Sequence, residues 1–194
     1  EDAYFDEGGF VQSAHPGAVL IDFSASTPGF ARELGAVATV SDLGFVEAPI
    51  ALEDMLDPRP FDEENLVCYV AGEEDAVAAA QGLLNAVCGR VVECGAAGTA
   101  QLMRAVRTLQ EAAAVVSAIE ANALVRAAHR AALGNGLSDV AISGLSEPAE
   151  RMLEAVREKR FEGAFTAEMF LSELQAALAS ADDADLILPQ AEST

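Results

Sequence analysis

Two arginines three residues apart are the side chains in this sequence best suited to hold an anion. Arg104 and Arg107 lie in a stretch without proline or glycine, Thr99 to Leu133, which predicts a long helix. Residues three apart share one helix face, so the two guanidinium groups could form a two-armed site for a carboxylate. The alternative is a helix-surface arginine paired with a nearby acid. Because arginine stays charged, Arg104 could polarise a carbonyl but should be a poor proton shuttle.

Few other side chains offer chemistry. Ser24 ends an apolar run, where its hydroxyl could contact a ligand or simply cap the turn. His15 precedes a Pro-Gly turn and is expected to face solvent. His129 lies near the end of the predicted long helix, where a cation is favoured. Neither histidine is expected to be catalytic, and no serine–histidine–acid or paired-carboxylate arrangement follows from the spacing.

The cysteines argue against a metal site or a disulfide framework. Their number is odd and their spacing irregular, at Cys68, Cys88 and Cys94. With only two histidines in the chain, a zinc site is not expected either. We interpret the three thiols as buried, small, apolar groups of a protein in a reducing compartment, which predicts a cytoplasmic location.

The composition excludes several kinds of partner. The chain has 194 residues, of which 52% are hydrophobic, enough to bury a core. Its 32 acidic and 11 basic residues give a net charge of −21, which repels phosphate backbones and anionic lipid surfaces. The uncharged run Ala112 to Ile119 is too short to cross a bilayer. We therefore expect neither nucleic-acid nor membrane binding, and we interpret the acidity as a solubility device.

Apolar runs and turn signals predict strands and helices that alternate at first, followed by helices alone. The expected strands are Ala18–Ser24, Gly44–Ile50 (stopped by the proline), Leu66–Gly72 and Arg90–Gly95. The expected helices are Pro28–Val40, Glu73–Cys88, Thr99–Leu133, Pro148–Lys159 and Thr166–Ala181. A loop or short ordered turn is expected over 51–65, and a fraying tail from Asp182. This order predicts an α/β domain over residues 1–95 and an all-α domain over residues 96–194.

Four stretches carry motif-like patterns in a fixed order. They are PGAVLIDFSASTP (16–28), FVEAPI (45–50), the run from Val70 to Leu109, and FEGAFTAEMFLSEL (161–174). The first resembles a strand followed by Asp-x-Ser-Thr and proline, and the second resembles a strand with Asp-Ala-Pro-Val. The third resembles a Gly-Gly-acid helix with a Gly-x-x-Gly loop before a long helix. The fourth resembles a Phe-x-x-x-Phe run before Lys-Asp-Leu. These are patterns of the 3-hydroxyisobutyrate and 6-phosphogluconate dehydrogenase superfamily, and the resemblance covers about Glu7 to Pro189.

The resemblance implies a fold and an activity. The fold would be the second half of a Rossmann-like dinucleotide-binding domain, followed by a 6-phosphogluconate dehydrogenase-type helical domain that forms a homodimer through the long helix. The activity would be NAD(P)-dependent oxidation or reduction of a small β-hydroxyacid or related anion. The family's Gly-x-Gly-x-x-Gly turn is absent, and the loop 95–98 lacks its pattern. NAD or NADP is therefore expected only if residues upstream of Glu1 supply that turn. The missing strands of the half-sheet are likewise expected from upstream residues or another chain.

The resemblance also implies site residues. Arg104 stands where the family has its catalytic lysine, and Arg107 stands where an asparagine follows. Ser24, Ala25 and Gly98, together with Arg107, would contact the substrate. Ser24 would also lie near the nicotinamide.

Three departures weaken this interpretation. The first is the arginine at position 104 in place of lysine. The second is Ala51-Leu52-Glu53 where the family has Ser-Gly-Gly, because a glutamate would repel an acidic substrate. The third is Ser172, which replaces the cofactor-side lysine of Lys-Asp-Leu. The alternative is therefore a catalytically weak or inactive relative that serves as an anion-binding or dimerisation module. A helical interaction module without a ligand would explain the alanine-rich second half but not the strand motifs.

Overall fold

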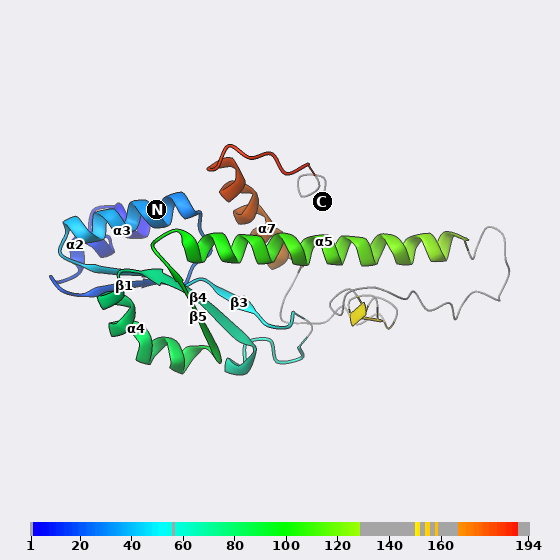
Figure 1. Cartoon of the computed structure of the whole chain (residues 1–194), viewed down its shortest axis with the longest axis horizontal. Coiled ribbons are helices and arrows are strands. Elements are labelled where there is room, and N and C mark those ends of the chain that lie inside the picture. Colours follow the sequence, from blue (N-terminus) through cyan, green and yellow to red (C-terminus); the bar gives the residue numbers. More distant parts are fainter. Residues whose placement is uncertain are drawn as a thin grey trace.

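A mixed β-sheet with helices on both faces makes up the first half of the chain in the computed structural model (Figure 1). The structure describes residues 2–55, 57–128, 150–151, 154–155, 158 and 167–189. Two short helices, α1 (Asp2–Phe5) and α2 (Phe10–Ser13), precede the sheet. The predicted order of strands alternating with helices is confirmed.

The four predicted strands all form. They are β1 (Val19–Asp22), β2 (Gly44–Glu47), β4 (Leu66–Gly72) and β5 (Arg90–Gly95). The strands β1 and β2 are parallel, β4 runs antiparallel to β2, and β5 runs parallel to β4. Within the described residues β1 pairs with β2 alone, so its outer edge is unpaired, as the half-sheet prediction requires.

The second strand ends at Glu47, before the proline, as predicted, but the sequence analysis missed a strand that follows the proline. A further strand, β3 (Ile50–Leu52), pairs antiparallel with β4 in the same register as β2. Pro49 lies between β2 and β3 and has no N–H to donate, but its carbonyl still accepts a hydrogen bond from the Tyr69 N–H at 3.1 Å. The proline thus interrupts the ladder without ending it. The short ordered turn predicted within 51–65 appears as η1 (Glu63–Asn65).

Helices α3 and α4 cover opposite faces of the sheet (Figure 1). Helix α3 (Pro28–Val40) begins with the predicted proline, and the Thr27 hydroxyl accepts a hydrogen bond from the Phe30 N–H at 3.2 Å. Helix α4 (Glu74–Val87) has acids in its first turn, as its N-terminal dipole favours. Neighbouring strand residues alternate between the faces: Phe45 packs with α3 and Val46 with α4.

The long helix α5 (Thr99–Ala128) lies on the α3 side of the sheet and extends beyond it (Figure 1). Helix α7 (Ala167–Asp182) packs against α5. Both helices confirm the predictions for their segments up to the limits of the described residues. The predicted end of the long helix and most of the helix expected over 148–159 lie outside those residues. No helix in the part of the chain that the structure describes is long and apolar enough to cross a membrane.

Candidate functional site

The loop after β1 is the exposed part of the candidate site. Ser24 and Ala25 are exposed, whereas Asp22 just before them is buried. An Asp22 carboxylate oxygen accepts hydrogen bonds from the Ser24 N–H at 2.9 Å and from the Ser24 hydroxyl at 2.6 Å. The serine hydroxyl is therefore used as a donor, but its oxygen can still accept. Ligands of open α/β sheets bind beyond the carboxyl ends of parallel strands, which is where this loop lies.

Gln101 ties this loop to the first turns of α5, and the sequence analysis missed it. The side chain is 1% exposed. Its amide oxygen accepts a hydrogen bond from the Ser26 N–H at 3.1 Å, and its amide nitrogen donates to the Ser24 carbonyl at 2.9 Å. The available signal was a polar residue three positions before Arg104, and thus on the same helix face.

Arg104 is buried, not on the helix surface. Its Nε donates to the Ile50 carbonyl of β3 at 3.2 Å, and its Nη2 forms an ion pair with Glu173 of α7. Burial lowers the pKa of Arg104, while the charge of Glu173 acts in the opposite direction. The predicted pairing with an acid is present, but the acid lies 69 positions away in the chain rather than on the same helix.

Arg107 makes a separate set of contacts. Its Nη2 donates to the carbonyls of Leu52 and Glu53, the second at 3.2 Å, and its Nε donates to Glu111 at 2.7 Å. The Glu53 carboxylate lies 3.8 Å from its Nη1. Both arginines thus have β3 carbonyls and nearby acids as partners. A ligand carboxylate would have to displace one of these partners, and whether it does so remains a prediction.

The loop between β5 and α5 is already occupied by a carboxylate of the chain itself. Glu47, the last residue of β2, is fully buried, and its Oε1 accepts from the N–H groups of Gly98 at 2.6 Å and Ala100 at 3.1 Å. Burial raises the pKa of Glu47, although these N–H groups act to lower it. Because the donors at this helix N-terminus are taken, the loop 95–98 is poorly suited to bind pyrophosphate. The sequence signal for Glu47 was an acid inside an apolar strand.

The other predicted site residue, Ser172, is exposed on α7 beside Glu173. Among the described residues, no hydrogen bond joins it to the Ser24 loop. His15 is exposed, as predicted, and its ring contacts the Pro16 carbonyl at 3.2 Å. His129 lies outside the described residues.

The thiols are shielded from solvent to different extents. Cys68 and Cys88 are buried, and Cys94 is half-buried. Burial raises the pKa of Cys68 to about 12, so its thiol stays protonated and unreactive at neutral pH. In the part of the chain that the structure describes, no three histidine, cysteine or acidic residues are arranged to hold a metal.

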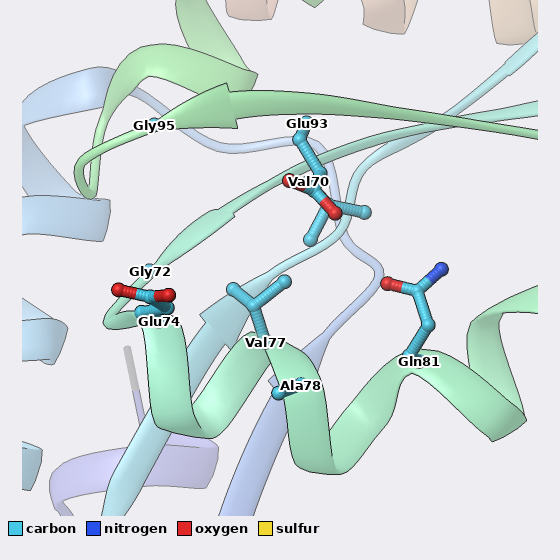
Figure 2. A pocket seen from close by; sticks show the side chains of 8 residues that line it. All are labelled: Val70, Gly72, Glu74, Val77, Ala78, Gln81, Glu93 and Gly95. Carbon is cyan, nitrogen blue, oxygen red and sulfur yellow. The ribbon is translucent and has the colours of Figure 1, made fainter.

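A pocket of about 510 Å³ lies elsewhere, between α4 and the strands β4 and β5 (Figure 2). Val70 and Val77 are among its apolar lining residues, and Glu74 and Glu93 are among its polar ones. It lies on the α4 side of the sheet, because Val70 packs with the α4 core while its neighbours Tyr69 and Ala71 pack with Ala100 of α5. The two carboxylates would repel an anionic ligand. We therefore place the candidate site where the Ser24 loop and β3 meet the first turns of α5.

Comparisons with known proteins agree with the strand motifs. The profile of the NAD binding domain of 6-phosphogluconate dehydrogenase matches residues 1–98. Human mitochondrial 3-hydroxyisobutyrate dehydrogenase is 32% identical over 120 residues, which are 62% of this chain and 34% of that protein. An uncharacterised oxidoreductase of Bacillus subtilis is 26% identical over 189 residues, 94% of this chain and 62% of that protein. The chain thus spans about a third to three fifths of these relatives.

Solved structures share the fold. A 3-hydroxyisobutyrate dehydrogenase from Salmonella typhimurium matches with a TM-score of 0.71 at 21% identity, over 99% of this chain and 66% of that one. The Mycobacterium tuberculosis 3-hydroxyisobutyrate dehydrogenase with L-serine matches with a TM-score of 0.62 at 20% identity, over 94% and 64%. At these identities the likeness supports the architecture alone.

Proposed function

The chain belongs to the family defined by the NAD-binding domain of 6-phosphogluconate dehydrogenase, within the β-hydroxyacid dehydrogenases, and we propose that it acts in NAD(P)-dependent oxidation or reduction of a small hydroxyacid or related anion. One observation carries the proposal. Gln101 holds the exposed Ser24 loop against the helix that carries Arg104, three residues further on. This contact supports the proposal that the nicotinamide side, at Ser24, and the substrate side, at Arg104, are neighbours where the Ser24 loop meets the first turns of α5.

The chain's residues fit one end of a dinucleotide. Ser24 and Ala25 are exposed at the carboxyl end of β1, where they could hold the nicotinamide edge. A nicotinamide, when bound, accepts or donates a hydride. The loop 95–98 does not fit the pyrophosphate, because Glu47 takes its donors. We expect the pyrophosphate contacts to come from residues outside those described.

Arg104 would act on the substrate by charge. Its fixed guanidinium could orient a carboxylate or polarise a carbonyl if Glu173 or the Ile50 carbonyl gave way. It cannot serve well as the general acid and base, because its proton is held too tightly near neutral pH. With Arg107 we assign it to the substrate side, and Ser172 remains a proposed cofactor contact. Gly98 is buried and donates its N–H to Glu47, so its proposed contact with the substrate requires Glu47 to release that N–H. We expect slow turnover.

A second candidate is a catalytically inactive relative that binds an anion or dimerises. The specific observation in its favour is that Arg104 and Arg107 bind carbonyls and carboxylates of the chain itself. The acids near them, Glu53, Glu111 and Glu173, outnumber the two arginines. An incoming anion therefore meets little free positive charge.

Cofactor binding tests the family function. We expect NADH or NADPH to raise the thermal unfolding midpoint of the protein, because a ligand that binds only the folded state stabilises it. At a ligand concentration of 100 Kd the gain is about 2.7 kcal/mol. If neither nucleotide shifts the midpoint, the oxidoreductase proposal fails.

Replacement of Arg104 by lysine separates the two candidates. A lysine there can lose its proton more readily, so Arg104→Lys should raise the rate of nucleotide reduction with small β-hydroxyacids by about tenfold or more. Arg90→Lys is the matched control, because Arg90 is exposed and pairs with Glu53 on the surface. If Arg104→Lys binds the nucleotide and gains no activity, the inactive relative is the better description.

We further propose that residues 1–95 and 96–194 form two domains and that a second copy of the chain is the partner. In support of a dimer, α5 exposes large apolar side chains, at Leu102, Met103, Val106, Ile119 and Leu124. The shielded, unpaired thiols support a reducing, cytoplasmic location.

A further inference from the structure

The amide of Gln101 is oriented by its two partners. A backbone N–H, from Ser26, must meet the amide oxygen, and a backbone carbonyl, of Ser24, must meet the amide nitrogen. The side chain thus hydrogen-bonds to both kinds of backbone group in the loop, as a neighbouring strand would, although it lies 75 positions further along the chain. With 1% exposure, the amide has no bulk water to replace these bonds.

The loop has few other anchors at this point. Asp22 holds the Ser24 N–H and hydroxyl, and Thr27 caps α3. Between these anchors, the buried hydroxyl of Ser26 has no hydrogen-bond partner among the described residues, so that side chain does not tie the loop down. The Gln101 amide therefore joins the exposed Ser24–Ala25 segment to α5.

The same helix face carries Arg104. The two residues are three positions apart and both are buried. Arg104 is held in place by the Ile50 carbonyl and by Glu173. A shift of the loop relative to α5 would therefore change the separation of Ser24 from Arg104.

We propose that Gln101 is a positioning residue that holds the Ser24–Ala25 loop in place against the α5 turn bearing Arg104, and so sets the spacing of the nicotinamide side and the substrate side. The role in catalysis rests on the proposed function, whereas the role in holding the loop does not. Gln101 itself touches neither substrate nor cofactor.

Backbone hydrogen exchange in the full chain tests the hold on the loop. In Gln101→Met, a variant of similar shape without hydrogen-bonding groups, we expect the protection factor of the Ser26 N–H to fall about three- to tenfold, the loss of roughly one net hydrogen bond. The matched control is Gln110→Met, because Gln110 is exposed on the same helix. Unchanged protection at Ser26 in Gln101→Met would overturn the proposal.

A pH-dependent rescue distinguishes this role from a general packing role. In Gln101→Glu, a protonated carboxyl can accept from the Ser26 N–H and donate to the Ser24 carbonyl, as the amide does. An ionised carboxylate cannot donate and would repel that carbonyl. Because position 101 is buried, the pKa of the introduced carboxyl should lie above its usual value of about 4.3. Ionisation leaves the Ser26 N–H an acceptor but replaces the bond to the Ser24 carbonyl by repulsion, which should loosen the loop as a whole. The protection factor at Ser26 should therefore be near the wild-type value at about pH 5 and fall towards about pH 8, while Gln110→Glu shows no such change. A pH-independent Gln101→Glu would contradict the proposal, even if Gln101→Met failed to fold.

Nucleotide binding tests the link to function separately. If wild type binds NADH or NADPH, Gln101→Glu should bind it about three- to tenfold more weakly at about pH 8 and recover at about pH 5, in step with Ser26 protection. If Gln101→Glu binds the nucleotide as tightly as wild type at both pH values, Gln101 does not position the nucleotide site. If wild type binds neither nucleotide, the proposed function fails, and the exchange measurements alone decide whether Gln101 holds the loop.

Discussion

At the residue scale, a buried carboxylate supports the start of the long helix. Glu47 accepts two N–H bonds through Oε1, while its Oε2 has no hydrogen-bond partner among the described residues. Desolvation by burial is the largest influence and raises the pKa, and the nearby charge of Asp22 acts in the same direction. The helix N-terminus compensates only in part. The ionised form of Glu47 is therefore less stable in the folded protein than in water.

This shift predicts a pH dependence of stability. A folded-state pKa above the unfolded value, about 4.3, means that the folded protein binds the proton more tightly. The resulting stabilisation is complete below the unfolded pKa and is lost as pH rises through the folded one. Glu47→Gln does not titrate and its oxygen can still accept both N–H bonds. The unfolding midpoint of Glu47→Gln minus that of wild type should thus increase as pH rises from about 4 to about 8.

The comparison needs a carboxylate that is not buried. Glu93→Gln serves as the control, because Glu93 is exposed on β5 of the same sheet and its replacement should cost no more than about 0.5 kcal/mol. Thermal unfolding followed by circular dichroism gives the midpoint of each variant minus that of wild type at each pH. A Glu47→Gln difference that is constant over this pH range would show that Glu47 has no such shift.

Residue types predicted candidates, but not their partners. That Arg104 and Arg107 share a helix face followed from their spacing. Their binding to β3 carbonyls and to Glu173 did not, because those contacts join segments more than fifty positions apart in the chain. Glu47 was part of a recognised motif, but only packing shows that its carboxylate meets the α5 N-terminus.

At the element scale, the junction of β5 with α5 depends on a glycine. Gly98 has φ +94°, and a Cβ there would lie 2.9 Å from the Pro28 carbonyl oxygen at the start of α3. Gly95 has a similar φ, +101°, but a Cβ there would meet nothing within 4 Å. The left-handed backbone is shared by the two positions, so the contact with α3 is what distinguishes them.

We therefore expect Gly98→Ala to cost more stability than Gly95→Ala. Each should lose about 1–2 kcal/mol to the backbone conformation, and Gly98→Ala should lose about 1–3 kcal/mol more because α3 and α5 must move apart. Urea unfolding of the two variants measures the difference. Equal losses would mean that α3 yields without cost and that the junction is not tightly packed.

Helices and strands could be predicted where the signal, an apolar periodicity or a helix cap, lies within the segment itself. The Thr27-Pro28 start of α3 and the acids opening α4 are such cases. Strand β3 was missed because proline normally marks a strand end, and only pairing with β4 carries the ladder past Pro49. The mixed strand directions also depend on that pairing, which no local pattern reveals.

At the scale of the whole molecule, charge opposes the proposed dimer. Each copy carries a net charge of −21, and two copies must bring these charges together to cover the exposed apolar residues of α5. Salt shortens the range of the repulsion, from about 10 Å at 0.1 M to about 3 Å at 1 M. Within one chain, the same screening relieves self-repulsion and should stabilise the folded state.

Raising NaCl from about 0.05 M to about 1 M should therefore increase both the unfolding midpoint and the dimer fraction measured by light scattering. Val106→Asp should abolish the increase in mass but keep the increase in midpoint, because Val106 is 42% exposed on α5 and its replacement leaves the core intact. A chain that stays monomeric at every salt concentration while its midpoint rises would refute the dimer through α5 and leave the charge effect standing. An unfolding midpoint that does not change with salt would show that repulsion among the acidic side chains does not reduce the stability of the folded chain.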